Sequence, residues 1–325
     1  MIQGPGRFEY YLIQLDELLE KASKTENPAL FLFENDARTK LFMLEGLSKL
    51  YAGLHNKKRF TYAMEYFKSL EDMLGAVDYY DSFAKDFLTD PIMPSTITLF
   101  VESKREENFK AINEILIKKK WINNDTSRIK KIKKKIKSAD WKTPEKEVEL
   151  IKQFYYKEIE NINKFYKEAG NEFTEIELQV HELRRKLRWL SIYPQALLGC
   201  VQFADNGTES AELLKYLKPE IVNSPYNIMP LAGNNEFFVL FEKKYFLALS
   251  YVINALGKIK DKCLRVLAIA EAVQNTQFIT EDIAMERALA LNRQDSDGLK
   301  VNLKKAKEIC EPFFAEGNLG KLIVQ

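Results

Sequence analysis

The sequence predicts an all-α protein, and three observations support this prediction. Apolar residues recur at steps of three and four along most of the 325 residues, which is the spacing of an amphipathic helix. Only 13 Gly and 10 Pro interrupt the chain, whereas an all-β fold would need many more turns. Leu, Lys, Glu, Ala and Ile dominate the composition, which leans helical as a whole. A hydrophobic share of 46% and a charged share of 30% are those of a folded globular protein.

Helical patterns follow one another along the chain, with start and stop signals between them. Pro144 suits the first position of a helix, and Gly170 suits the residue after its end. Pro194 is expected to stop a later helix at the residue before it. The expected helices span residues 8–21, 36–54, 58–88, 104–120, 127–137, 144–170, 173–193, 236–274, 280–292 and 299–314. No segment alternates convincingly with period two; Phe237–Phe241 is the best strand candidate, and it fits a buried helix equally well.

Two similar motifs indicate an internal repeat. Leu74-Gly75-Ala76-Val77-Asp78 in the first half has a counterpart in Leu256-Gly257-Lys258-Ile259-Lys260-Asp261 in the second, and each follows a long apolar-rich helix. A helix with a basic residue precedes each motif, carrying Arg38 in the first case and Arg184 in the second. The separations are unequal, so a duplication requires an insertion in the second copy. We therefore expect two helical halves, residues 1–143 with a basic connector and residues 144–325.

The helix expected at 173–193 carries a core-facing stripe and a cluster of nitrogen donors. The stripe consists of apolar residues at steps of four and three, namely Ile176, Val180, Leu183, Leu187 and Leu190. On another face, four basic side chains fall within about 100° of arc: His181, Arg184, Arg185 and Arg188. Guanidinium groups bind phosphate oxygens with two N–H groups at once, and a flanking His adds a pH-dependent donor. The cluster fits a phosphate site, and it equally fits a solvated face that pairs with Glu177 and Glu182.

These residues resemble the motifs of the CHAD family, the conserved histidine α-helical domain. Each half of a CHAD protein has a His-x-x-Arg motif followed by a basic cluster, and later a Leu-Gly-x-x-(Arg/Asn)-Asp motif. In the second half of this chain His181 and Arg184 match the first motif, and Arg188 matches the first residue of the basic cluster. The later motif is matched by Leu256, Gly257, Lys260 and Asp261. In the first half Arg38 matches the Arg, and Asn35 stands at the His position.

The resemblance implies a fold and a function. It implies two pseudo-symmetric halves, each like a four-helix bundle, with extra helices. It also implies non-enzymatic binding of inorganic polyphosphate or a related phosphorylated polyanion in a basic groove. The anion-binding residues would be His181, Arg184 and Arg188, supported by Arg185, Lys258, Lys260 and Arg38. The alternative is a helical scaffold or protein-interaction module that keeps this fold but has lost anion binding.

The segment from Lys118 to Lys142 is the most basic part of the chain. It holds eleven Lys or Arg residues against Asp125 and Asp140, although the net charge of the whole chain is only +2. Three isoleucines at positions 129, 132 and 136 form a narrow apolar seam within it. The segment fits an exposed connector whose Lys stems cover apolar surface, and it also fits a helix that holds a polyanion, nucleic acid or an anionic membrane. We favour the connector, and we do not expect nucleic acid or a membrane as a partner.

Other kinds of chemistry find little support. Glu177 and His181 have the spacing of metal ligands, but no second such pair accompanies them, so no metal and no cofactor are expected. The three cysteines form no CxxC pair and indicate a reducing compartment. No signal peptide is evident at the N-terminus, and we expect a cytoplasmic protein. With two His in the chain and no assembled catalytic group, we expect no enzyme.

Overall fold

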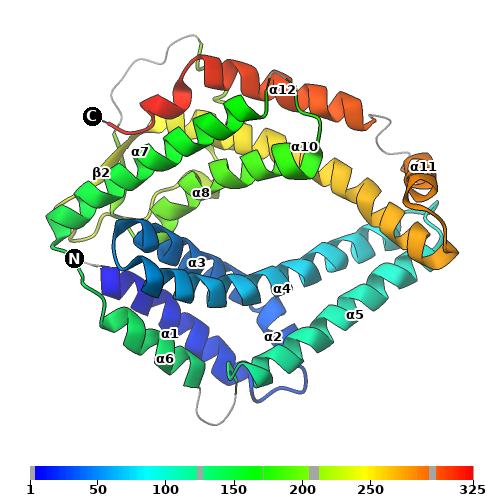
Figure 1. Cartoon of the computed structure of the whole chain (residues 1–325), viewed down its shortest axis with the longest axis horizontal. Helices are drawn as coiled ribbons and strands as arrows, with labels where there is room; N and C mark the ends of the chain where they lie inside the picture. The colour runs from blue at the N-terminus through cyan, green and yellow to red at the C-terminus, as the bar shows by residue number, and fades with distance from the viewer. Residues whose placement is uncertain (1–3, 123–126, 171, 205–211, 293–297, 325) are drawn as a thin grey trace. The chain divides into compact units, whose positions relative to one another are not determined.

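The computed structural model describes all residues except 1–3, 123–126, 171, 205–211, 293–297 and 325. The described chain is mostly helical, which confirms the predicted fold class, and it contains two short strands that the all-α prediction lacked (Figure 1). In the described part, no helix combines the length and the apolar character that a membrane crossing requires.

The chain divides into two compact units. The N-terminal unit comprises Gly4–Asp140 together with Leu264–Ser296. The C-terminal unit comprises Trp141–Cys263 together with Asp297–Gln325. The chain changes unit between residues 140 and 141, close to the expected division after residue 143. It returns to the N-terminal unit for residues 264–296, which the sequence placed in the second half.

The N-terminal unit is built entirely from helices in its described part. They are α1 (Gly4–Ala22), α2 (Pro28–Glu34), α3 (Ala37–Leu54), α4 (Lys57–Thr89), α5 (Ser95–Lys118), α6 (Ser127–Lys137), α11 (Glu281–Leu291) and the end of α10 (Lys243–Gln277). Helix α3 packs along α4, α4 packs along α5, and α1 packs along α3. The predicted spacing of apolar residues explains this packing, because Leu41, Leu44 and Leu47 are fully buried. Phe8, Tyr51 and Phe60 add an aromatic cluster in which ring centroids lie 5.5 to 5.6 Å apart.

A second core lies at the far end of α4. It joins Phe87 of α4, Val101 of α5, Ile269 and Val273 of α10, and Ala288 of α11, all of them buried. Arg265 of α10 lies beside this core and is only 8% exposed. Residues 264–296 therefore complete the core of a unit whose other residues precede position 141.

The C-terminal unit combines helices with a small sheet. Its elements are α7 (Pro144–Glu168), a π-helical turn η1 (Ile176–His181), α8 (Glu182–Ala196), β1 (Val201–Ala204), α9 (Pro219–Val222), η2 (Pro225–Asn227), β2 (Val239–Glu242), the first part of α10, α12 (Leu299–Ala315) and η3 (Asn318–Lys321). Tyr155 of α7 packs edge-on against Tyr193 of α8 and Phe241 of β2, with centroids 5.9 and 5.0 Å away. All three side chains are fully buried and form the centre of this unit.

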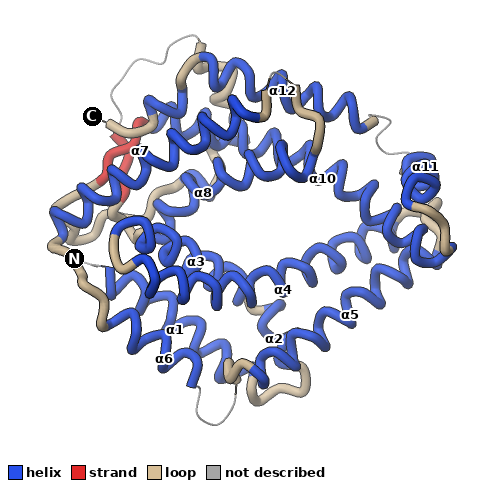
Figure 2. The backbone as a smooth tube through the Cα atoms, viewed as in Figure 1, coloured by secondary structure: helices blue, strands red, loops and turns tan. Residues whose placement is uncertain are grey.

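Two predictions about this unit need correction. Helix α10 begins at Lys243, because residues 239–242 form β2, which overlaps the strand candidate Phe237–Phe241. Its parallel partner β1 was not predicted from the sequence (Figure 2). The helix expected at 173–193 begins as η1 at Ile176 and passes through Pro194 to Ala196. Pro194 thus lies inside α8, whose last turn ends two residues later. The chain then turns through Leu198 and Gly199, both with positive φ, toward β1.

Candidate anion-binding site

The predicted basic residues lie on different elements. His181 is the last residue of η1, and Arg184, Arg185 and Arg188 lie on α8. Lys258 and Lys260 lie on α10, and all six belong to the C-terminal unit. Arg38 lies on α3 in the N-terminal unit, and its surroundings are described by themselves.

Arg184 lies against the backbone of α10 at Gly257. Its Nε donates a hydrogen bond of 3.2 Å to the carbonyl oxygen of Ile253. A Cβ atom at Gly257 would lie 3.1 Å from this Nε, so glycine allows the guanidinium to approach the helix closely. Burial lowers the pKa of Arg184, and the charge of Asp261 opposes this shift. An arginine stays charged in proteins under such conditions. Among the described residues Arg184 forms no ion pair.

His181 and Lys260 place two more nitrogen groups near this guanidinium. Nδ1 of His181 lies 3.0 Å from Oε2 of Glu177. Burial lowers the pKa of His181, Glu177 acts in the opposite direction, and the charges of Lys260 and Arg184 lower it further. Nζ of Lys260 lies 3.3 Å from Oδ1 of Asp261, whose side chain is 71% exposed. We call His181, Arg184 and Lys260 the α8–α10 cluster.

The remaining predicted residues lie outside this cluster. Arg185 forms an ion pair of 2.8 Å with Glu182. Arg188 is exposed one turn further along α8. Lys258 is exposed and precedes Lys260 by two residues, so the two side chains leave α10 in nearly opposite directions. The structure therefore brings together three of the six residues predicted for the second half.

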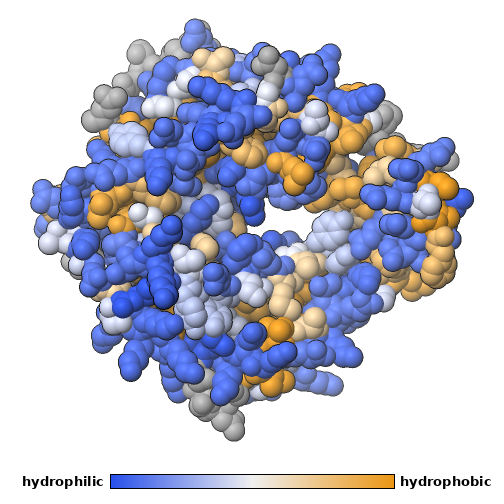
Figure 3. Space-filling view, viewed as in Figure 1, coloured by the Kyte–Doolittle hydropathy of each residue, from blue (hydrophilic) through white to orange (hydrophobic). Residues whose placement is uncertain are grey.

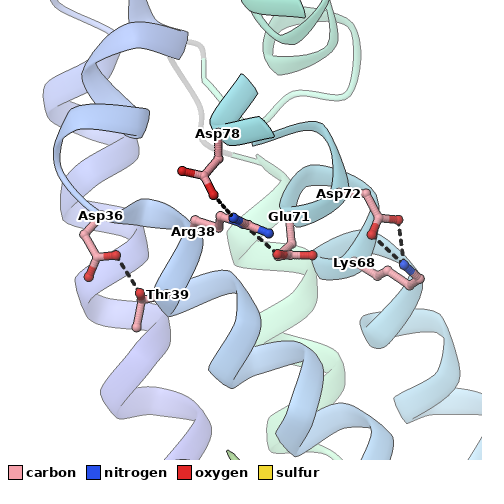
Figure 4. A network of polar contacts seen from close by, with 7 residues as sticks. All are labelled: Asp36, Arg38, Thr39, Lys68, Glu71, Asp72 and Asp78. Carbon is pink, nitrogen blue, oxygen red and sulfur yellow. Dashed lines mark hydrogen bonds and ion pairs between the residues drawn. The ribbon is translucent and has the colours of Figure 1, made fainter. Parts of the chain in front are cut away.

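Arg38 of the N-terminal unit makes a similar contact with Gly75 of α4. A Cβ atom at Gly75 would lie only 2.8 Å from Nη2 of Arg38. Two carboxylates bind the same guanidinium: Nε lies 2.8 Å from Oε1 of Glu71, and Nη1 lies 2.6 Å from Oδ2 of Asp78 (Figure 4). The two motifs that suggested a repeat thus each place an arginine on a glycine, but Arg38 is neutralised by acids of its own unit.

Equal spacings from the two glycines show how the sites differ. Glu71 lies four residues before Gly75, and Ile253 lies four residues before Gly257. Three residues after each glycine stand Asp78 in one site and Lys260 in the other. The N-terminal site therefore surrounds its arginine with two acids, whereas the C-terminal site offers a backbone carbonyl and a further cation.

Sequence reasoning had not included Glu71 or the Ile253 carbonyl in either site. Glu71 is charged but only 7% exposed, because it packs between α3 and α4. The sequence feature that could have identified Glu71 is its position four residues before Gly75. Residues at this spacing share one face of a helix, so both face α3. Within the described residues, no group of three or more His, Cys, Asp or Glu side chains is placed to hold a metal ion.

Comparisons of the chain with protein-family models, with curated proteins and with solved structures give no match.

Proposed function

We propose that the protein is a non-enzymatic binder of inorganic polyphosphate or a related phosphorylated polyanion, and that the α8–α10 cluster is its binding site. The observation that best supports this proposal is that the guanidinium of Arg184 forms no ion pair with a described residue. Arg38, which makes a similar contact with a glycine, binds two carboxylates. A half-buried guanidinium that forms no ion pair with a described residue favours binding of an anion from solution.

The chemistry of the cluster suits phosphate oxygens. Arg184 is held in place by Gly257 and the Ile253 carbonyl, and a fixed guanidinium loses little side-chain entropy when an anion binds. Lys260 adds a second charge. The lowered pKa of His181 leaves its ring mainly neutral at pH 7, and a bound polyanion would raise that pKa. Affinity should therefore increase as the pH falls, because binding and protonation of His181 are linked.

The CHAD resemblance and the matching contacts support a common origin for the two sites. In both units an arginine packs on a glycine of a long helix, and the residues at equal spacings differ mainly in charge. On this proposal the chain is a duplicated pair of helical halves in which only the second half kept its anion site.

The alternative is a scaffold that binds no anion, and one observation favours it. Arg38 binds two carboxylates of its own unit, so an arginine that contacts a glycine in this way can have a purely structural role. A protein of this kind would bind polyphosphate weakly and without dependence on Arg184.

The test is a titration of the protein with inorganic polyphosphate at two salt concentrations, using wild type and two variants. Arg184→Gln removes the guanidinium. Lys260→Asp keeps Arg184 but gives the site the acid that Asp78 provides beside Arg38. Both should lose affinity at least tenfold, and the salt dependence should become shallower because fewer phosphates are neutralised. Arg185→Gln is the matched control, since it removes one charge from the same helix outside the cluster.

The outcomes separate the two functions. If Lys260→Asp and Arg184→Gln bind like wild type while Arg185→Gln does the same, the cluster is not the site. If wild type itself shows no affinity at low salt, the scaffold function replaces the proposed one.

A further inference from the structure

Helix α6 presents a row of lysines that the proposed function does not use. Its three isoleucines, Ile129, Ile132 and Ile136, are at most 3% exposed and pack toward α1 and α4. On the opposite side four lysines are exposed, and we call them the α6 basic face: Lys130, Lys131, Lys134 and Lys137. At 100° per residue these four fall within about 120° of arc, centred away from the isoleucine seam. The surface over α6 is mainly hydrophilic (Figure 3).

The flanking cations of α6 fix the helix on the N-terminal unit. Lys133 forms an ion pair of 2.7 Å with Asp16 of α1. On the other flank Nζ of Lys135 lies 3.3 Å from the ring centroid of Tyr62, and Arg128 lies 4.1 Å from that of Tyr66. Contacts on both flanks thus hold the helix that carries the basic face on the N-terminal unit.

Acids do not balance this face in the described structure. Helix α6 contains no acidic residue, and none of the four lysines of the basic face forms an ion pair with a described residue. The exposed Lys118, Lys119 and Lys120 at the end of α5 extend the charge, because Arg128 joins the two segments by a 2.8 Å hydrogen bond to the Lys119 carbonyl. The small net charge of the chain conceals this concentration.

We infer, contrary to the expectation from the sequence alone, that the α6 basic face binds the sugar–phosphate backbone of a double-stranded nucleic acid, independently of its sequence. The face extends about 10 Å along the helix axis, a length over which duplex DNA presents about six phosphate charges at one per 1.7 Å. Four lysines on one side of α6 can contact several of these phosphates, and such contacts do not depend on the bases.

Two other partners fit the observations less well. Amphipathic helices bind membranes by inserting their apolar face, but here that face is buried inside the unit. Single-stranded nucleic acids bind by stacking bases on aromatic rings, but Lys135 and Arg128 already cover Tyr62 and Tyr66. Backbone contact with a duplex needs neither feature.

The experiment measures binding of a short DNA duplex of mixed sequence to the full chain by fluorescence anisotropy. At physiological salt we expect a dissociation constant of about 10⁻⁴ to 10⁻⁶ M, and a slope of log affinity against log salt of about −3 to −4 for four lysines. The variant Lys130→Gln, Lys131→Gln, Lys134→Gln, Lys137→Gln should lose at least tenfold in affinity.

A matched control removes the same charge elsewhere. Lys157, Lys164, Lys167 and Lys300 are exposed residues of the C-terminal unit, and their replacement by Gln also lowers the net charge from +2 to −2. This control should bind the duplex within about twofold of wild type. Equal losses in both variants would show that net charge acts rather than α6, and would overturn the inference.

Further arms address the other partners and the proposed polyphosphate site. Binding to vesicles that contain phosphatidylserine, or to single-stranded DNA, without binding to the duplex would also overturn the inference. Arg184→Gln should leave duplex binding unchanged, whereas the α6 variant should keep the polyphosphate affinity that depends on Arg184. The two proposals can therefore fail separately.

Discussion

Arg38 and Arg184 make the same contact with a glycine but have different electrostatic surroundings. Arg38 binds Glu71 and Asp78, and Glu71 is buried between α3 and α4. Arg184 donates to one neutral carbonyl. The side chains around each arginine, rather than the arginine itself, decide whether the contact stabilises the fold or leaves charge for a ligand.

This difference predicts unequal effects on stability. Arg38→Gln should lower the free energy of unfolding by about 2 kcal/mol at pH 7, because hydrogen bonds to charged groups contribute about 1.5–3 kcal/mol and a buried carboxylate loses its partner. Arg184→Gln should cost less than about 1 kcal/mol. Urea denaturation of both variants measures this. Equal losses would mean that the carboxylates at Arg38 add nothing.

The sequence could predict these contacts only in part. The repeated Arg and Gly pointed to equivalent positions, and both pairs do touch. The position of Glu71 one helical turn before Gly75 was a signal in the sequence, but it was not enough, because an acidic residue at a helical position is usually solvated. Only the way α3 packs on α4 shows that it faces Arg38.

At the scale of elements, the pair of α3 and α4 encloses an unusual group of acids. Glu45 of α3 is 6% exposed and lies near Glu71 of α4. Burial raises the pKa of Glu45, and the charges of Glu71 and Asp72 add to this effect while those of Lys68 and Lys49 oppose it; together they raise the pKa to about 7. Glu45 therefore takes up a proton in the folded state at a pH where the unfolded chain has lost it.

The sign of the pH dependence follows from this shift. The folded state binds more protons than the unfolded state between the ordinary pKa of 4.5 and the raised value of about 7, so stability falls as the pH rises through this window. The shift amounts to about 3 kcal/mol at pH 8. Glu45→Gln should remove this contribution and be the more stable protein at pH 8, with little difference at pH 4.5. Urea denaturation at both pH values checks this, with the exposed Glu65→Gln as the control. A variant that keeps the full pH dependence of wild type would exclude Glu45 as its source.

Helices and strands differed in how far the sequence revealed them. The helix predicted to start at Pro144 does so, and the seam of isoleucines on α6 is buried as its spacing indicated. Strand β1 is four residues long and pairs with a segment more than thirty residues later, so no local period could reveal it. The predicted start of α10 at residue 236 was wrong, because the residues of β2 are apolar enough to fit a helical pattern as well.

At the scale of the whole molecule, a buried arginine links the segment after residue 263 to the N-terminal unit. Arg265 binds Asp86 of α4 at 2.7 Å, Asp90 after α4 at 2.6 Å, and Asn292 after α11 at 2.5 Å. These contacts attach residues 264–296 to the N-terminal unit. Sequence reasoning placed this segment in the second half, because only long-range contacts reveal where it packs.

Arg265→Met should therefore loosen the N-terminal unit. Loss of the guanidinium leaves the carboxylate of Asp90, only 5% exposed, without its partner, and breaking such a buried pair costs about 3–5 kcal/mol. Hydrogen exchange should show faster exchange in α11 and at the end of α4 together. Arg287→Met, which removes an exposed arginine from α11, should change neither. Protection of α11 as in wild type would show that the apolar core alone holds the segment.

The discontinuous N-terminal unit also has a consequence for the time course of synthesis. The core beside Phe87 and Val101 needs residues 264–296, yet the ribosome must first make the whole of Trp141–Cys263. At about 5–20 residues per second, this delay lasts about 6 to 25 s. During this time the apolar residues at the end of α4 stay exposed to water, because the segment that covers them has not been made. We therefore expect the nascent chain to need protection from aggregation at that stage.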